Sequence, residues 1–125
     1  MKIEDQVLSI EQVRELQELG FDVRKHASLY FVEEKYFVKE NFIVLPEQID
    51  ITRVPEDVKI TPTMTIGDII KVLPTEIDEF VLNMNRRYVA YDSRTDSLFY
   101  AYRYRFINSL FDCLVWCIKE KHIKL

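Results

Sequence analysis

The chain has 125 residues, a formal net charge of −4, 48% hydrophobic residues and 30% charged residues. This is the composition of one globular domain, and it excludes disordered and collagen-like classes. Gly20 and Gly67 are the two glycines of the sequence, so a glycine-rich phosphate loop and a dinucleotide fingerprint are excluded as well.

The N-terminal segment lacks the features of an export signal. Glu4 and Asp5 interrupt the apolar run that such a signal needs. No stretch approaches the roughly 18 uncharged apolar residues of a membrane-spanning helix. We therefore expect a cytoplasmic protein with no membrane contact, whose thiols at Cys113 and Cys117 are reduced. Residues 1–7 are expected to be loose.

The first predicted element is a helix that begins after Ser9. Ser9 and Gln12 have the spacing of a capping box, in which each side chain binds the backbone N–H of the other residue. Gly20 follows as a C-terminal stop. The apolar residues between them recur every three positions and predict one broad buried face: Ile10, Val13, Leu16 and Leu19.

Three short strands are predicted next, at Leu29–Val32, Tyr36–Val38 and Phe42–Leu45. The polar trio Glu33–Lys35 predicts a hairpin between the first two strands. Residues 46–64 contain three prolines, which remove backbone donors and restrain their neighbours. This segment is therefore predicted to be a long extended connection with at most one short strand, around Ile49–Ile51.

Thr65 and Asp68 predict a second capped helix, which Pro74 closes. Three strands are expected after it, at about 77–84, 87–92 and 97–105. The last predicted element is a helix over about residues 106–121. Its apolar stripe consists of Ile107, Leu110, Phe111, Leu114 and Ile118.

These elements predict a single domain over residues 1–125. Their order is helix, strands, helix, strands, helix. Strands joined by short turns are antiparallel. We therefore expect an α+β fold in which an antiparallel sheet of about five to six strands is packed on one face by three helices.

Three stretches of the chain carry a family resemblance: Ile10–Asp22 with Ala27-Ser28, Thr65–Pro74 and Ser109–Ile118. Together they resemble a group of small uncharacterised proteins of gut bacteria, often encoded near prophage or mobile-element genes. The shared residues are mainly helix caps and core positions, and residues 46–62 match least. The resemblance implies a bacterial cytoplasmic origin and an accessory role for a phage or mobile element. It brings no catalytic motif, cofactor or known activity.

Residues 86–105 combine tyrosines with five arginines and two aspartates, a local net charge of +3. Alternate side chains of a strand share a face. The strand at 97–105 is therefore predicted to present two rows: Tyr100, Tyr102 and Tyr104 on one face, and Arg103 and Arg105 on the other. Tyrosine and arginine are favoured at protein interfaces, and they also bind single-stranded nucleic acid. Alternatively, the tyrosines simply cover the sheet with their hydroxyls at its edge.

Trp116 is the second candidate contact. At 100° per residue it points away from the apolar stripe of the last helix, toward the side of Asp112 and Glu120. An exposed tryptophan on a polar face indicates a contact with another protein or a second copy. The alternative is that the N-terminal segment or residues 46–64 cover it.

The sequence offers little for catalysis or metal binding. Cys113 and Cys117 lie four residues apart near His122, but structural zinc usually needs a second ligand pair, and there is no other cysteine. Two packed, reduced thiols are expected instead. His26 is expected to be solvated in a polar loop. No nucleophile has a plausible base beside it, so no catalytic, cofactor-binding or metal-binding residue is predicted.

The sequence therefore favours a small cytoplasmic protein-interaction module that acts on a protein partner or as a homodimer. Its candidate interface is Trp116, Tyr100, Tyr102, Tyr104, Arg103 and Arg105. One alternative is a single-stranded nucleic-acid binder that uses the strand at 97–105. A third hypothesis, an enzyme of unidentified chemistry, would need a concave pocket with shifted titrating groups.

Overall fold

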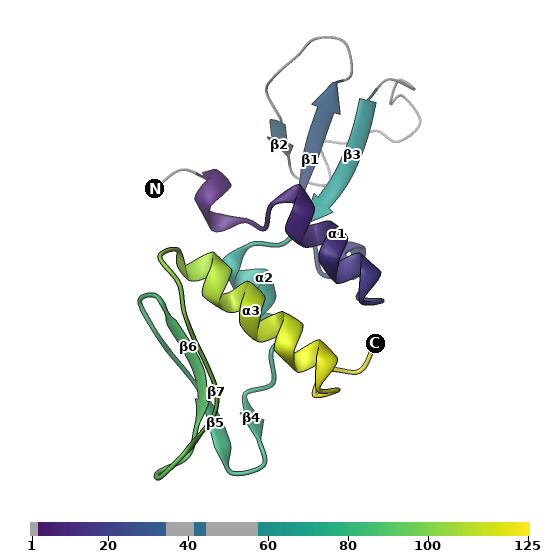
Figure 1. The fold of residues 1–125 in the computed structure, drawn as a ribbon. Helices are drawn as coiled ribbons and strands as arrows, with labels where there is room; N and C mark the ends of the chain where they lie inside the picture. Colours follow the sequence, from purple (N-terminus) through teal and green to yellow (C-terminus); the bar gives the residue numbers. More distant parts are fainter. Residues whose placement is uncertain (1–2, 35–41, 45–57) are drawn as a thin grey trace.

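The computed structural model describes residues 3–34, 42–44 and 58–125. Its elements, with η denoting a 3₁₀ helix, are η1 (Ile3–Gln6), α1 (Ile10–Glu18), η2 (Val23–Lys25), β1 (Leu29–Glu34), β2 (Phe42–Val44), β3 (Val58–Thr63), α2 (Ile66–Val72), β4 (Glu76–Ile77), β5 (Phe80–Asn85), β6 (Tyr88–Asp92), β7 (Ser97–Tyr102) and α3 (Phe106–Lys119). The α+β class and the order of helices and strands are confirmed (Figure 1).

The strands form two antiparallel sheets, whereas the sequence predicted one. The first sheet has the order β2-β1-β3 and the second has the order β4-β5-β6-β7. Strand β3 leads directly into α2, which separates the two sheets along the chain. The prediction of one sheet was wrong because strand patterns show where strands form and not which strands pair.

Two predicted caps are present in full. The Ser9 hydroxyl accepts a hydrogen bond from the Gln12 backbone N–H, and the Gln12 side chain accepts one from the Ser9 N–H. Thr65 and Asp68 exchange the same pair of bonds at the start of α2. Gly20, just beyond α1, has a φ of +88°, a conformation that glycine adopts without strain.

The first sheet differs from the predicted hairpin. Strand β1 continues through Glu34, so the predicted turn at Glu33–Lys35 was wrong for its first two residues. Residues 30–32 of β1 pair with β2, and Leu29–Glu34 pair along their whole length with β3. The polar residues predicted a turn, but pairing with β3, which is distant in the sequence, extends the strand. The predicted strand at Tyr36–Val38 lies outside the described residues.

Two segments expected to be irregular are structured in part. Residues 58–63 form β3, so the predicted connection over 46–64 was wrong for this stretch; 45–57, including the suggested strand at Ile49–Ile51, lies outside the described residues. At the N-terminus, Ile3–Gln6 form η1, and Val7 is 3% exposed and makes a β-bridge to Thr65. Pro62 is tolerated because β3 lies at an edge of its sheet.

The second sheet is a meander whose neighbouring strands follow one another along the chain. The predicted strand at 77–84 is divided into β4 and β5 by a turn at Asp78, whose φ is +53°. The turn between β5 and β6 contains Arg86, whose φ is +56°. The predicted strand at 97–105 ends at Tyr102, and α3 begins at Phe106.

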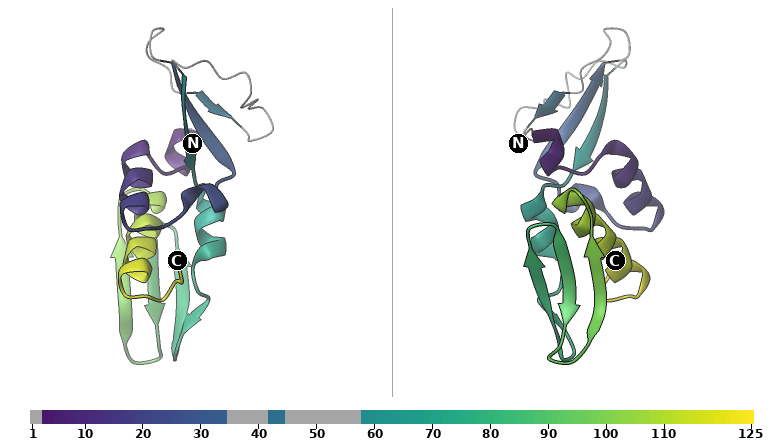
Figure 2. Two further views of the ribbon diagram at one scale, coloured as in Figure 1. Left: turned by 90° about the vertical axis from the view of Figure 1, so that its right-hand side faces the viewer. Right: turned by 60° about the vertical axis from the view of Figure 1, so that its left-hand side comes forward.

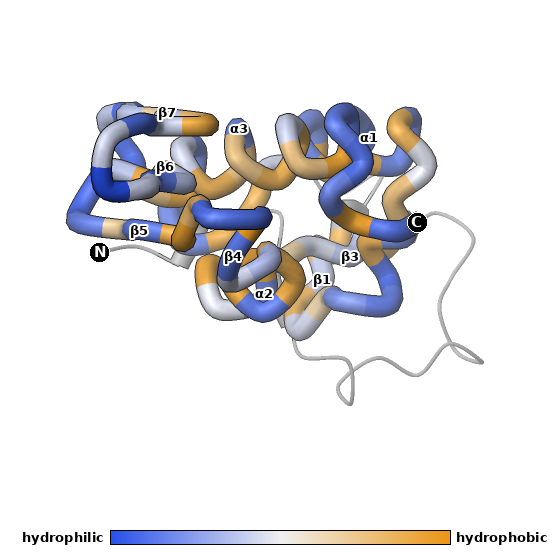
Figure 3. The backbone as a smooth tube through the Cα atoms, turned by 90° about the horizontal axis from the view of Figure 1, so that it is seen from below, coloured by the Kyte–Doolittle hydropathy of each residue, from blue (hydrophilic) through white to orange (hydrophobic). Residues whose placement is uncertain are grey.

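Helix α3 occupies the centre of the molecule. It lies along one face of the second sheet, with α2 beside it and α1 on the side away from that sheet (Figure 2 and Figure 3). Leu110 and Leu114 of α3 belong to one buried cluster with Leu16 of α1, Ile69 of α2 and Val89 of β6. A single connected core therefore joins both halves of the chain.

Asp68 holds α2 to the segment before β1. Its Oδ2 accepts bonds from the Thr65 N–H (3.0 Å) and from the N–H and hydroxyl of Ser28. We expect Asp68→Ala to lower the free energy of unfolding by roughly 1–3 kcal/mol, because these donors lose their acceptor. Urea unfolding followed by circular dichroism measures the change.

Asp22→Ala is the matched control, because Asp22 is exposed and its side chain makes no capping bond at η2. Its unfolding free energy is expected to stay within about 0.5 kcal/mol of the wild type. Equal losses in the two variants would contradict the role assigned to Asp68.

Candidate protein-interaction surface

The face of the second sheet that is turned away from α3 carries exposed aromatic side chains. Tyr100 and Tyr102 of β7 are each 59% exposed, and Tyr104, just beyond β7, is 79% exposed. Val81 of β5 is 54% exposed. Tyr88 of β6 pairs with Tyr102 across the strands and its ring lies 5.0 Å from the ring of Tyr100. We refer to these five residues as the tyrosine face.

Strand alternation produces this face. Every second residue of β5, β6 and β7 points to α3 and the core, which leaves the intervening residues on the opposite side. The inward set contains Leu82, Met84, Val89, Tyr91 and Phe99. No described segment lies over the tyrosine face (Figure 3). The sequence placed Tyr100, Tyr102 and Tyr104 on one face and left open whether that face is buried; the structure shows these side chains exposed. The sequence missed Val81, which strand alternation through β5 could have indicated.

A hydrogen-bonded network fixes one part of the tyrosine face. The Tyr88 hydroxyl donates to Oδ2 of Asp92, and the Asn83 amide donates to the same oxygen at 3.2 Å. The bond from Tyr88 is the main cause that lowers the pKa of Asp92, and the same bond raises the pKa of Tyr88. The Asp92 carboxylate therefore accepts its hydrogen bonds from donors within its own chain.

The arginines near this face divide into two groups. Arg103 binds Asp112 of α3 at 2.6 Å, and Arg105 binds Asp5 at 2.6 Å. Both predicted interface arginines thus have acidic partners within the chain, and the bond to Asp112 raises the pKa of Arg103. Arg87 instead lies over the ring of Tyr104, with its guanidinium carbon 4.6 Å from the ring centroid. This arrangement places a cation at the end of the tyrosine face.

The sequence left two alternatives for Trp116, exposed on a polar face or covered by its own chain, and the structure favours the second. Trp116 is half-buried and packs against the core. Its ring stacks on Phe99 of β7 at 4.8 Å and lies 5.8 Å from Tyr91 and 4.9 Å from His122. Among the described residues, the second sheet covers part of this ring through Phe99 and Tyr91, and most of residues 46–64 lie outside the described ranges. The helical-wheel argument failed because α3 is packed on more than one side.

The two cysteines lie in the core beside a tyrosine. Cys113, Cys117 and Tyr91 are each 0% exposed, and both thiols are free. The Tyr91 hydroxyl donates to the Pro74 carbonyl at 2.8 Å and lies 3.8 Å from Sγ of Cys117. Burial raises the pKa of Tyr91, and the hydrogen bond with Cys117, together with burial, raises the pKa of Cys113. The raised pKa values keep Tyr91 and Cys113 neutral near pH 7, and all three side chains pack in the core.

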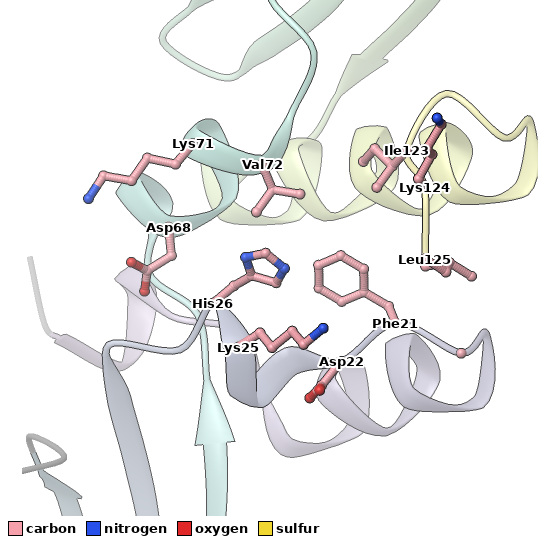
Figure 4. Close-up of a pocket in the computed structure, with 11 residues that line it drawn as sticks. Phe21, Asp22, Lys25, His26, Asp68, Lys71, Val72, Ile123, Lys124 and Leu125 are labelled. Carbon is pink, nitrogen blue, oxygen red and sulfur yellow. The ribbon is translucent and has the colours of Figure 1, made fainter.

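A pocket of about 550 Å³ lies on another side of the molecule, between the end of α1, α2 and the C-terminal residues (Figure 4). Its wall contains His26, which is exposed and stacks on Phe21 with ring centroids 5.1 Å apart. Lys25, Lys71 and Asp68 also line it. Asp68 is already committed to Thr65 and Ser28, whereas Asp22, which also lines the pocket, is exposed and makes no capping bond at η2.

A second pocket of about 540 Å³ adjoins the tyrosine face. Arg86, Arg87, Tyr104, Arg105 and Phe106 contribute to its lining. Within the described ranges, no group of three or more His, Cys, Asp or Glu side chains could hold a metal ion. The same residues contain no helix that is long and apolar enough to cross a membrane.

No family model, curated protein or solved structure matches this chain. The interpretation of the tyrosine face therefore depends on its geometry and chemistry alone.

We expect Trp116→Ala to lower the free energy of unfolding by roughly 3 kcal/mol, because it removes the ring that packs on Phe99 and Tyr91. Tyr102→Ala, at a largely exposed ring, is expected to cost less than about 1 kcal/mol. Urea unfolding of both variants tests the assignment. A smaller loss for Trp116→Ala than for Tyr102→Ala would contradict it.

The Tyr88–Asp92 bond also predicts a pH dependence. Because the pKa of Asp92 is lowered in the folded state, its contribution is present above the ordinary value of 3.8 and is lost as the pH falls through the folded-state pKa. Because the pKa of Tyr88 is raised, its contribution is present below 10.0 and is lost as the pH rises through the folded-state pKa.

Tyr88→Phe removes the bond at every pH. Its urea midpoint is therefore expected to lie below the wild-type midpoint at neutral pH, and this gap is expected to narrow in strong acid. Both groups are half-buried at the molecular surface, where solvent still weakens the interaction, so the gap should be small. A gap that widens in acid would contradict the assignment.

Proposed function

We propose that this protein is a small cytoplasmic interaction module that binds an extended, acidic segment of a partner protein on the tyrosine face. The observation that carries the proposal is the row of three largely exposed tyrosines on an open sheet: Tyr100, Tyr102 and Tyr104. Contiguous exposed aromatic patches of this kind mark interaction sites. Tyrosine suits them because it contributes a large apolar ring with a hydrogen-bonding tip.

The distribution of charge favours an acidic partner segment. Arg86 and Arg87 are exposed at the turn between β5 and β6, and Arg94 is exposed at the turn between β6 and β7. These two turns lie at opposite ends of the strands. A segment about six residues long, extended at about 3.3 Å per residue, would therefore meet an arginine at each end of the tyrosine face.

The ion pairs within the chain favour protein over nucleic acid. The excess of three positive charges within residues 86–105 falls to one when Asp112 and Asp5, which bind Arg103 and Arg105, are counted with them. The whole chain carries −4. A protein gains affinity for nucleic acid when its positive side chains neutralise phosphates and release their counterions. This surface has few positive charges in excess for that purpose.

Single-stranded nucleic acid remains the second candidate. One observation favours it: three exposed tyrosines lie beside Arg87, which stacks on Tyr104. Bases stack on such rings, and a guanidinium can hold a phosphate. An enzyme gains no comparable support. Tyr91 and Cys113, whose pKa values are strongly raised, lie in the core and have no exposed surface.

The proposal includes the cellular location and the biological context of the protein. A cytoplasmic location is supported by two free thiols that lie in the core without a disulfide. An accessory role for a phage or mobile element, implied by the resemblance, stays a prediction that no comparison tests.

Selection from a random peptide library tests the partner class. We expect nuclease-treated wild-type protein to enrich peptides in which acidic residues flank aromatic or apolar ones. A selected peptide, measured by fluorescence anisotropy, is expected to bind Arg87→Glu at least about tenfold more weakly, because a favourable charge contact becomes repulsive. Arg14→Glu is the matched control, because it makes the same charge change at an exposed position of α1.

Two results would contradict the proposal. One is equal enrichment of the same peptides on Arg87→Glu. The other is binding of a mixed-sequence oligonucleotide whose affinity falls steeply with salt, because counterion release reduces the affinity of each phosphate contact as salt rises. That result would favour the nucleic-acid candidate.

A further inference from the structure

Strand β7 forms an edge of the second sheet and lacks the usual protection of an edge. The sheet order ends at β7, and no described strand pairs with its outer side. Its residues Ser97–Tyr102 include no charged residue, glycine or proline. Edge strands of monomeric proteins usually carry such residues because an unprotected edge pairs readily with another strand.

The hydrogen-bond pattern shows which residues face outward. The Arg103 N–H donates to the Arg87 carbonyl, which identifies these two residues as a hydrogen-bonded pair of the β6–β7 ladder. Such pairs recur at every second residue of an antiparallel ladder. Ala101 and Phe99 therefore direct their backbone groups toward β6, and Tyr100 and Tyr102 direct theirs to the open edge.

The outward segment is regular. The register shift between β6 and β7 is confined to Tyr91/Asp92, near the start of β7, so Phe99–Tyr102 follow an uninterrupted register. Tyr100 and Tyr102 thus present backbone groups at the edge that no described strand pairs with, and their side chains lie on the tyrosine face. A strand added here would hydrogen-bond to the same residues whose rings it could contact.

We propose that this edge pairs with a second copy of the chain. The two β7 strands run antiparallel, a two-fold axis passes beside Tyr100, and the two four-stranded sheets become one continuous sheet. This proposal concerns an edge and a partner different from those of the proposed function, and it does not depend on an acidic segment.

Charge complementarity favours a second copy. Asp96 precedes β7, and Arg103 and Arg105, which also bind Asp112 and Asp5 of their own chain, follow it, with no charge between them. Antiparallel pairing places the arginine end of one strand beside the aspartate end of the other. No like charges meet along β7 itself. At the axis, the two Tyr100 rings lie on one face, where aromatic cross-strand pairs stabilise a sheet.

Pairing through one strand edge predicts a weak dimer. One strand edge buries less surface than a typical permanent dimer interface. We therefore expect a concentration-dependent equilibrium, measured by sedimentation velocity from micromolar to several hundred micromolar protein.

Opposite charges at residue 100 provide the test. In the proposed register this residue faces its own symmetry mate, so Tyr100→Lys and Tyr100→Glu each place like charges opposite one another. Each variant alone is expected to weaken dimerisation at least about tenfold. An equal mixture of the two is expected to dimerise again, because lysine then faces glutamate. Circular dichroism and thermal melting should match the wild type, since Tyr100 is 59% exposed.

Val81→Lys is the matched control, because Val81 is exposed on the same face but lies on β5, away from the edge. It is expected to dimerise like the wild type. The proposal is overturned by a wild-type chain that stays monomeric at every concentration, by single Tyr100 variants that dimerise normally, or by a mixture that stays monomeric. A dimer lost in Val81→Lys would also overturn it.

These measurements contain no peptide. Failure of the dimer therefore leaves the peptide-binding test with Arg87→Glu unaffected, and failure of peptide binding leaves the dimer test unaffected.

Discussion

The burial of α3 is the constraint on which the rest of the structure depends. Leu110, Cys113, Leu114 and Cys117 of this helix have no exposed surface. Such burial requires packing on more than one side, and the second sheet, α2 and α1 supply it. Because α3 covers one face of the second sheet, and no described element covers the other, the opposite face is left to solvent. The tyrosine face is thus a consequence of how the core is built.

The tyrosine face and the β7 edge are two aspects of the same strand. Backbone groups of Tyr100 and Tyr102 lie at the edge, and their rings lie on the face. A dimer formed at this edge would join two tyrosine faces into one longer surface. A partner with two binding segments would then gain affinity, because the second contact becomes intramolecular. Dimerisation and recognition would be coupled through shared residues.

The parts of this structure that the sequence could predict are those that short-range chemistry decides. The capping boxes at Ser9 and Thr65 and the stop at Gly20 involve neighbours within a few residues, and all three are present. Strand alternation alone places Tyr100 and Tyr102 on one face, and the packing of α3 decides that this face is the exposed one. The failures involve distant partners. The sequence could not decide whether Trp116 is exposed or covered, because the position of Phe99 relative to α3 depends on how the sheet folds back onto the helix.

Ion pairs with residues elsewhere in the sequence also determine which arginines are available to a partner. Arg105 meets Asp5, which is a hundred residues away, and Arg103 meets Asp112 across the turn into α3. A count of charges along the strand therefore overestimates its attraction for phosphate. Arg87, which stacks on Tyr104, keeps its cation at the aromatic surface. The chain thus places two of its arginines in ion pairs that stabilise the fold and leaves Arg87 beside the exposed rings. Under the proposed function, this division would favour an acidic protein segment over a polyanion, because a few contacts suffice for the first and many are needed for the second.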